Sequence, residues 1–191
     1  GASSAFFLRK RGVSVILLER GLIGQQASGV NFGNVRRMGR PVEQLPLSNR
    51  SREIWLKFKE LFDDDAELLL NGHLRLGVTP AHEERMAKYA EEAKDFGLGM
   101  QMMSGKVLRE RFPYLGPDIT SGCYAPYEGH ANPRLAAPII GRAAVREGAQ
   151  VFENTEIVRI EKDGEDFYVT AADGRIFRAP VALITAGSWG N

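Results

Sequence analysis

The sequence has little of what metal centres and disulfide frameworks require: one cysteine and three histidines among 191 residues. Cys123 alone cannot form an internal disulfide or a cysteine-based zinc or iron–sulfur site. His73, His82 and His130 are too scattered to show the spacing of metal ligands. No charged stretch followed by an apolar core opens the sequence, so the expected location is the reducing cytoplasm. We expect no metal centre.

The sequence also lacks a charge surplus and long apolar runs. Its 25 basic residues face 24 acidic ones, giving a net charge of +1, so no excess of positive charge is available for nucleic acid. A hydrophobic fraction of 43% excludes a disordered chain. The longest apolar runs, Val13–Leu18 and Val181–Ala186, have the length of strands and fall far short of the ~20 residues that span a bilayer.

Glycine is abundant, with 21 of 191 residues, and several glycines and prolines separate segments with helix or strand patterns. A helix over 1–11 is followed by an apolar strand over 13–18, of the kind that is buried in a parallel sheet, and by a loop over 21–41. Asp163-Gly164 and Asp173-Gly174 predict hairpin turns. Further helices are expected at about 44–62, 79–96, 105–112 and 133–148, and further strands at 67–70, 73–78, 121–127, 150–152, 156–161, 167–171, 176–179 and 181–185.

This order predicts an α/β fold with two discontinuous domains. Residues 1–41 and 131–191 form the first, incomplete domain. Residues 42–130 form part of a mixed, β-rich (α+β) domain inserted into it.

The first twenty residues have the spacing of a dinucleotide-binding βαβ unit. Gly1 opens the helix, Gly12 closes it, and Glu19 ends the strand. In such a unit a glycine lets the helix pack closely on the sheet, the helix N-terminus faces the pyrophosphate, and an acid about 20 residues later binds the ribose hydroxyls. An ordinary helix and strand with a polar end explains the segment equally well, so this spacing alone leaves the question open.

Four stretches, in order along the chain, resemble FAD-dependent oxidoreductases of the D-amino-acid oxidase type, a family that includes glycine oxidase, sarcosine oxidase and D-amino-acid dehydrogenase. They are GASSAFFLRKRGVSVILLER (1–20), GQQASGVNFGNVRR (24–37), REGAQVFENTEIVRIEKDG (146–164) and APVALITAGSWGN (179–191). Four matches in series are more specific than any one of them. The resemblance implies that residues 1–41 and 131–191 are an FAD/NAD(P)-binding Rossmann-like domain and that residues 42–130 are part of the substrate-binding domain. It also implies a longer protein, because the family's first strand and C-terminal part are not in the sequence.

The resemblance also implies FAD as cofactor and gives its contacts. The loop over 24–37 would run beside the pyrophosphate and the flavin, and the strand ending at Ala186 and Gly187 would close over the nucleotide. Phe32 stands where a flavin-tethering histidine would otherwise lie, which favours non-covalent FAD. The implied cofactor-binding residues are Gly1, Ala2, Glu19, Arg20, Gln26, Ala27, Ser28, Asn31, Gly33, Asn34, Ile157, Ala186, Gly187 and Trp189.

Arginine outnumbers lysine by 18 to 7. The arginines between positions 34 and 52 are Arg36, Arg37, Arg40, Arg50 and Arg52, with Glu43 as the one acid in this segment. A guanidinium binds a carboxylate through two parallel hydrogen bonds, which suits an amino-acid oxidase. Arg36 and Arg40, just after the flavin loop, are our candidates for substrate or flavin contacts. Alternatively, these arginines pair with the acidic residues at 63–67 or lie in solvent.

We therefore expect an FAD-dependent enzyme that oxidises an amino acid or secondary amine carboxylate (a D-amino acid, glycine, sarcosine or an opine-like compound) to the imine by hydride transfer to the flavin. One alternative is an NAD(P)-binding Rossmann enzyme, in which Arg20 would read the adenosine phosphate. The short strands over 150–180 argue against it, because simple NAD domains lack them. Another is a non-catalytic nucleotide-binding subunit of a hetero-oligomer.

The expected partner is a small amino-acid or amine substrate, and no nucleic acid is expected. Peripheral membrane or second-subunit association, and homo- or hetero-oligomers, are left open. In the family's arrangement a central strand preceding Gly1 lies between 13–18 and 181–185. Because neighbouring strands lie about 4.8 Å apart, these two segments should not hydrogen-bond to each other directly.

Overall fold

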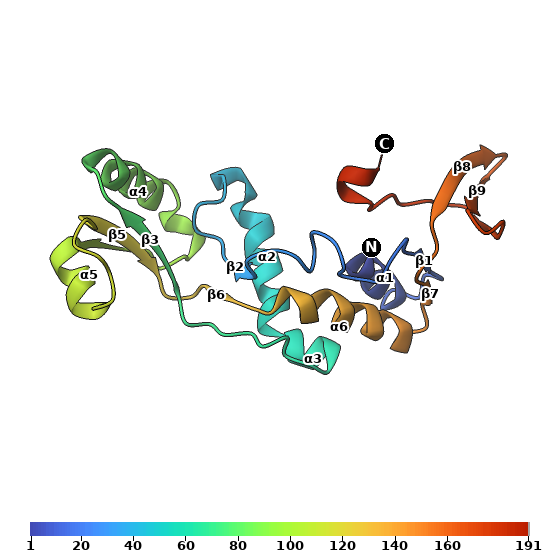
Figure 1. Cartoon of the computed structure of the whole chain (residues 1–191), viewed down its shortest axis with the longest axis horizontal. Coiled ribbons are helices and arrows are strands. Elements are labelled where there is room, and N and C mark those ends of the chain that lie inside the picture. Colours follow the sequence, from blue (N-terminus) through green and yellow to red (C-terminus); the bar gives the residue numbers. More distant parts are fainter. Residues whose placement is uncertain (191) are drawn as a thin grey trace. The chain divides into compact units, whose positions relative to one another are not determined.

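The computed structural model describes residues 1–190, and its contacts divide the chain into two compact units. Figure 1 labels the helices and strands of both. Unit 1 comprises Gly1–Phe32, Phe62–Ala66 and Pro133–Asn191, and unit 2 comprises Gly33–Leu61 and Glu67–Asn132. The boundaries differ from those expected from the sequence. Residues 33–41 and 131–132 belong to unit 2, and the short segment 62–66 belongs to unit 1. The assignment of the two parts to cofactor and substrate stays a prediction.

Two helices that lie side by side organise unit 1: α1 (Ala2–Arg9) and α6 (Pro133–Arg146) (Figure 1). Ala143 and Ala144 are buried on α6, and such small side chains allow two helices to approach closely. At the C-terminal end of α1, the Arg9 Nε donates a hydrogen bond to the backbone oxygen of Glu147 at 2.8 Å. Strand β1 (Ile16–Leu18) pairs in parallel with β7 (Gln150–Phe152).

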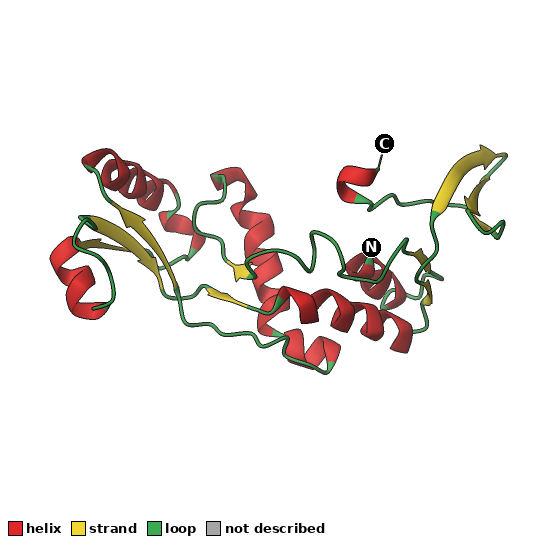
Figure 2. Ribbon diagram, in the orientation of Figure 1, coloured by secondary structure: helices red, strands yellow, loops and turns green. Residues whose placement is uncertain are grey.

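A three-stranded antiparallel sheet completes unit 1 (Figure 2). It consists of β8 (Ile157–Asp163), β9 (Asp166–Ala171) and β10 (Ile176–Ala179), with β9 in the centre. The two predicted turns are confirmed: Gly164 and Gly174 have φ angles of 59° and 87°, which glycine adopts without steric cost. The 3₁₀ turn η3 (Gly187–Trp189) follows later in the chain.

Three predicted strands are absent or shortened in the structure. The strand expected at 181–185 is not formed, and no backbone hydrogen bond reaches it within residues 1–190. A strand without a ladder partner gains nothing from an extended conformation. The expected strand over 67–70 is reduced to a single bridge between Leu69 and His130, and Glu67 lies in the left-handed region, with φ 54°, which no strand continues through. The apolar run over 13–18 forms a ladder only at β1. As expected, 13–18 and 181–185 share no hydrogen bond among the described residues.

Unit 2 contains the three-stranded antiparallel sheet β3–β5–β4, against which helices α4 and α5 pack (Figure 1). Its elements are β2 (Asn34–Val35), η1 (Val42–Gln44), α2 (Leu45–Leu56), α3 (Phe58–Phe62, whose last residue belongs to unit 1), β3 (His73–Gly77), α4 (Pro80–Glu92), η2 (Lys94–Phe96), β4 (Gln101–Ser104), α5 (Gly105–Arg111), β5 (Ser121–Ala125) and β6 (Gly129–His130). The helix predicted over 44–62 is interrupted at Lys57, which leaves the α region with φ −104° and ψ 14°.

The core of unit 2 lies between α2, α4 and β5, where Leu45, Met86 and Leu98 are buried with Cys123. Cys123 is fully buried, as expected for a small hydrophobic residue, and burial raises the pKa of its thiol. Helix α4 begins as predicted, with the Thr79 hydroxyl accepting a hydrogen bond from the His82 N–H. No helix among the described residues is long and apolar enough to cross a membrane.

Candidate functional site

Unit 1 contains a cavity of about 600 Å³ at the carboxyl end of β1 and the N-terminus of α1. We call it the unit 1 cavity. Of the predicted cofactor-binding residues, those that line it are Gly1, Ala2, Glu19, Arg20, Gln26, Ala27, Ser28, Ile157, Ala186, Gly187 and Trp189. These residues come from four separate stretches of the chain. The structure therefore brings most of the predicted cofactor set into one place.

Glu19 follows β1 directly and is half-buried. Its Oε1 accepts a hydrogen bond from the backbone N–H of Gly21 at 2.9 Å, which fixes the carboxylate at the cavity wall. The second oxygen, Oε2, has no hydrogen bond among the described residues. An ionised carboxylate accepts through both oxygens, so Oε2 is available for a pair of hydroxyl groups.

Helix α1 starts at the same wall. A Cβ atom at Gly1 would lie 3.1 Å from the Thr185 Oγ1 and 3.2 Å from the Leu17 Cδ1. The space at the start of the helix therefore suits glycine. The first turn of α1 contains no acidic residue. The partial positive charge of its free N–H groups is therefore not neutralised from within the helix, which favours an anion such as a phosphate.

The loop that follows Glu19 is shaped by close backbone contacts. A Cβ atom at Gly29 would lie 1.8 Å from the backbone oxygen of Gly24, so only glycine fits there. The Asn31 side chain donates hydrogen bonds to the backbone oxygens of Ala27 and Ser28 at 3.0 and 3.1 Å. Asn31 thus stabilises the backbone of its own loop. An asparagine in a loop does not by itself indicate this role.

The other predicted cofactor residues lie elsewhere. Asn31 does not line the unit 1 cavity. Gly33 and Asn34 belong to unit 2, where the Gly33 carbonyl accepts a hydrogen bond from the Ala131 N–H at 2.9 Å and Asn34 forms part of β2. Within the unit 1 cavity, the Arg20 guanidinium lies over the Trp189 ring, 5.7 Å from its centroid.

Unit 2 contains a second cavity, of about 420 Å³, which we call the unit 2 cavity. One face of helix α2 and its preceding turn forms a wall of it, with Gln44, Leu47, Ser48, Ser51, Arg52 and Trp55. These positions follow the i, i+3, i+4, i+7 spacing of a single helix face. This helical spacing is the sequence signal for the wall, a signal that the arginines alone do not provide.

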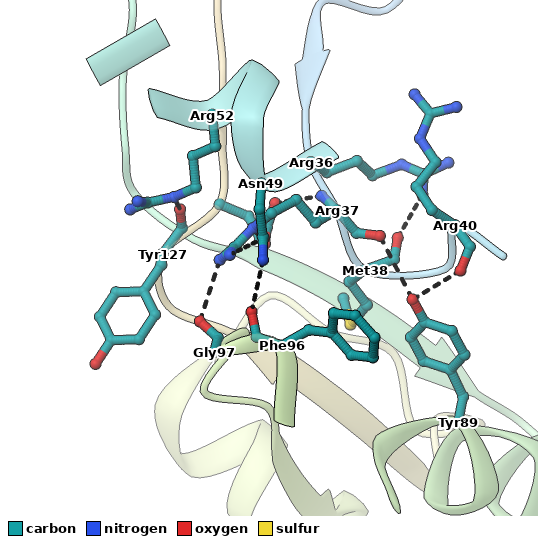
Figure 3. Close-up of polar contacts among 11 residues, drawn as sticks. Arg36, Arg37, Met38, Arg40, Asn49, Arg52, Tyr89, Phe96, Gly97 and Tyr127 are labelled. Carbon is teal, nitrogen blue, oxygen red and sulfur yellow. Dashed lines mark hydrogen bonds and ion pairs between the residues drawn. The ribbon is translucent and has the colours of Figure 1, made fainter. Parts of the chain in front are cut away.

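Arg37, which Figure 3 labels, forms a buried ion pair with Glu128, and both residues are among those that line this cavity. The Arg37 Nε lies 3.0 Å from the Glu128 Oε1, and the backbone N–H of Arg37 donates to Oε2 at 2.5 Å. The Arg37 Nη1 also donates to the Asn49 Oδ1 at 2.8 Å, and the Asn49 Nδ2 donates to the backbone oxygen of Phe96 at 3.2 Å. This network ties α2, η2, the segment after β2 and the turn before β6 together.

Both candidate substrate arginines line the unit 2 cavity. The Arg36 Nη1 donates to the backbone oxygen of Met38 at 2.5 Å, which holds the side chain in place. The backbone oxygen of Arg40 accepts a hydrogen bond from the Tyr89 hydroxyl at 2.8 Å. Among the described residues, neither guanidinium has a carboxylate partner, so the alternative of pairing with residues 63–67 is not seen for these two. Arg36 is half-buried, whereas Arg40 is exposed.

The charge of Arg36 acts on His73. Burial, and next the charge of Arg36, hold the pKa of His73 below its ordinary value of 6.5, while Glu128 opposes the shift. We expect Arg36→Gln to raise the pKa of His73, because it removes a positive charge that disfavours the imidazolium. Titration of the His73 ring protons by NMR measures this shift. Arg50→Gln is the control, since Arg50 pairs with Glu53, and an unchanged pKa in Arg36→Gln would contradict the assignment.

The model of the family described as "FAD dependent oxidoreductase" matches residues 1–191. Glycine oxidase of Geobacillus kaustophilus is 25% identical over 99% of this chain and 52% of that protein, and an opine oxidase subunit of Rhizobium meliloti is 25% identical over 87% and 48%. The structure of L-proline dehydrogenase from P. horikoshii superposes with a TM-score of 0.90 at 21% identity, over 99% of this chain and 50% of that one.

The chain belongs to the FAD-dependent oxidoreductase family, and its α/β fold is the fold of that family. It spans about half the length of the glycine oxidase and of the opine oxidase subunit. The residues of the unit 1 cavity fit the family's cofactor: a helix N-terminus with no acidic residue in its first turn suits a pyrophosphate, and Glu19 offers a free oxygen for ribose hydroxyls. The expectation of FAD as the cofactor thus agrees with the family and with the residues present.

Proposed function

We propose that the protein oxidises an amino acid or a secondary amine carboxylate to the imine, with FAD as the electron acceptor. The observation that supports this most directly is the unit 2 cavity, in which Arg36 and Arg40 have no carboxylate partner among the described residues. The names of the relatives, a glycine oxidase and a subunit of an opine oxidase, describe the same class of substrate. Which amino acid or amine is oxidised does not follow from these names.

In this reaction the substrate carbon loses a hydride, the amine nitrogen loses a proton to water, and water adds to the resulting C=N bond. The bound flavin supplies the acceptor for the hydride and its electron pair. Arg36 and Arg40 would orient the substrate through its carboxylate, because a guanidinium can donate two parallel hydrogen bonds. Their positive charges also disfavour a nearby ammonium. They therefore favour the neutral amine, whose lone pair is needed to form the C=N bond.

The test of this function is anaerobic mixing of the flavin-loaded protein with a panel of amino acids and N-alkyl amino acids. We expect at least one of them to bleach the visible flavin band, because the reduced flavin no longer absorbs there. The product solution is then assayed for the oxo acid formed by imine hydrolysis. A flavin band that no amine in the panel changes would argue for the non-catalytic nucleotide-binding alternative.

Glu19 provides a separate prediction about the cofactor. We expect Glu19→Ala to weaken FAD binding by about 1.5–3 kcal/mol, roughly 10–150-fold in the dissociation constant, because a hydrogen bond to a charged group is lost. Glu19→Gln keeps an acceptor for the Gly21 N–H but replaces the free oxygen by a donor. A loss of FAD affinity in this variant therefore reports on ribose binding and not on the turn at Gly21. Equilibrium titration of the apoprotein with FAD measures both variants. Glu161→Ala is the control, because Glu161 pairs with Arg159 on an exposed part of β8.

We also propose that the protein associates with a second subunit. The relative from Rhizobium meliloti is named as one subunit of its enzyme, which supports this but does not identify the partner. Measurement of the native mass of the flavin-loaded protein, purified from its own cells, tests the proposal. A second polypeptide in fixed stoichiometry is the expected result, and a mass that corresponds to this polypeptide alone would contradict it.

A further inference from the structure

We infer that the unit 2 cavity binds an amino acid or amine that carries two carboxylates, one held by Arg36 and Arg40 and the other by Arg52. The inference rests on the function proposed above and specifies its substrate class. It starts from an imbalance of charge: four arginines line the cavity, with Glu128 as the one acid among its lining residues.

Arg37 does not take part in this imbalance, because Glu128 neutralises it within the buried pair. Three guanidinium groups remain, those of Arg36, Arg40 and Arg52, and none has a carboxylate partner among the described residues. Arg36 and Arg52 are half-buried. Partly desolvated charges are costly unless they are paired, and a single carboxylate, whose two oxygens can accept from two guanidinium groups, supplies only one negative charge. The cavity therefore has more positive charge than a single carboxylate can use.

Arg52 is held in place as Arg36 is. Its Nε donates to the backbone oxygen of Tyr127 at 3.1 Å, and its guanidinium carbon lies 5.9 Å from the centroid of the Tyr127 ring. These contacts occupy Nε and one face of the guanidinium and leave its terminal nitrogens for another acceptor. Arg50, on the same helix, pairs with Glu53 at 2.5 Å. Glu53 on this helix thus neutralises Arg50, whereas Arg52 has no carboxylate partner among the described residues.

The positions of the three arginines suit two separate carboxylates. Figure 3 shows the Arg36 and Arg40 side chains on one side of the Arg37–Asn49 network and Arg52 on the other. Ser48 and Ser51 line the cavity along α2, together with Trp55. The volume of about 420 Å³ lies within the range of about 300–1,000 Å³ that small-molecule sites occupy. A secondary amine with a carboxylate on each arm, or an amino acid with an acidic side chain, has this distribution of charge.

Binding is tested first with probes that cannot form an imine. Thiodiglycolate has two carboxylates and methylthioacetate has one, and in both a sulfur atom replaces the amine nitrogen. Calorimetric titration of the flavin-loaded protein should show thiodiglycolate binding about 10-fold or more tightly, because it adds a charge-assisted pair. Arg52→Gln should abolish that preference, and the matched variant Arg50→Gln should keep it. Equal affinities for the two probes, or a preference that survives Arg52→Gln, would overturn the inference.

Turnover then distinguishes this inference from the proposed function. Iminodiacetate is compared with sarcosine, and glutamate with glutamine, so that the two pairs separate a second carboxylate on the nitrogen from one on the side chain. In Arg52→Gln we expect KM for the preferred dicarboxylate to rise about 10-fold or more, while KM for its monocarboxylate counterpart changes less than about 2-fold. An equal loss for both members of each pair would overturn the inference. If no amine bleaches the flavin while thiodiglycolate keeps its preference, the proposed function fails and the dicarboxylate site stands.

Discussion

Replacement of Glu128 by alanine is expected to lower the free energy of unfolding by about 3–5 kcal/mol, because it leaves a buried guanidinium without its counter-charge. The side chains of Arg37 and Glu128 are 7% and 1% exposed, so solvent cannot replace the lost carboxylate. The variant also removes the acceptor of the Arg37 backbone N–H. Urea denaturation of the flavin-loaded protein, followed by far-ultraviolet circular dichroism, measures the loss.

The chain offers a matched control for this experiment. Arg50 and Glu53 form an ion pair of 2.5 Å in which both side chains are largely exposed, 73% and 59%. Glu53→Ala should therefore change stability by no more than about 0.5 kcal/mol, because water and salt screen an exposed pair. Equal effects of Glu128→Ala and Glu53→Ala would contradict the role assigned to burial.

A double-mutant cycle separates the pair from its surroundings. Arg37→Ala leaves Glu128 buried as an unpaired carboxylate, and we expect a loss similar to that of Glu128→Ala. The double variant removes both charges, so its loss should be smaller than the sum of the two single losses. Additive losses would mean that the two side chains stabilise unit 2 independently, through Asn49 and the backbone contacts alone.

The elements that could be predicted from the sequence are those that local interactions determine. The turn at Asp173-Gly174 needs a glycine with positive φ, and helix α4 begins at a threonine whose hydroxyl caps its own first turn. Glu19 and Gly1 are positioned by one short helix and one strand, and both reach the unit 1 cavity. In each case the residues that decide the structure lie within about twenty positions of one another.

Features that depend on distant residues could not be read from the sequence. Glu128 is 91 positions from Arg37, and the pattern around neither residue indicates that they are paired. Among five neighbouring arginines, the sequence could not tell that Arg37 is the buried one. The wall of the unit 2 cavity is an intermediate case. The sequence shows the helical spacing of its residues, but only the structure shows that this helix face lies beside Arg36 and Arg40. The strand expected at 181–185 has a suitable composition, yet composition does not supply a neighbour.

Phe62 shows how a residue far along the chain completes the core of unit 1. Its ring lies 4.7 Å from that of Phe6 on α1, centroid to centroid, and each residue is 1% exposed. The Arg146 Nη2 donates to the backbone oxygen of Phe62 at 2.6 Å, which connects the segment 62–66 to the end of α6. This segment of the insertion is thus held in unit 1 by an aromatic pair and by a strong hydrogen bond to its backbone.

We expect Phe62→Ala to lower the free energy of unfolding by about 3–5 kcal/mol, because it removes a buried ring and leaves a cavity beside Phe6. Phe62→Leu should cost less, since it keeps much of the apolar volume. Tyr114→Ala is the control: Tyr114 is 80% exposed, and removal of its ring should change stability by no more than about 0.5 kcal/mol. Because Arg146 binds the backbone of residue 62 and not its ring, that hydrogen bond can persist in all three variants. A loss of less than about 1 kcal/mol in Phe62→Ala, measured by the same urea denaturation, would therefore mean that the segment is held in unit 1 by its backbone, and that Phe6 finds other partners when the ring is gone.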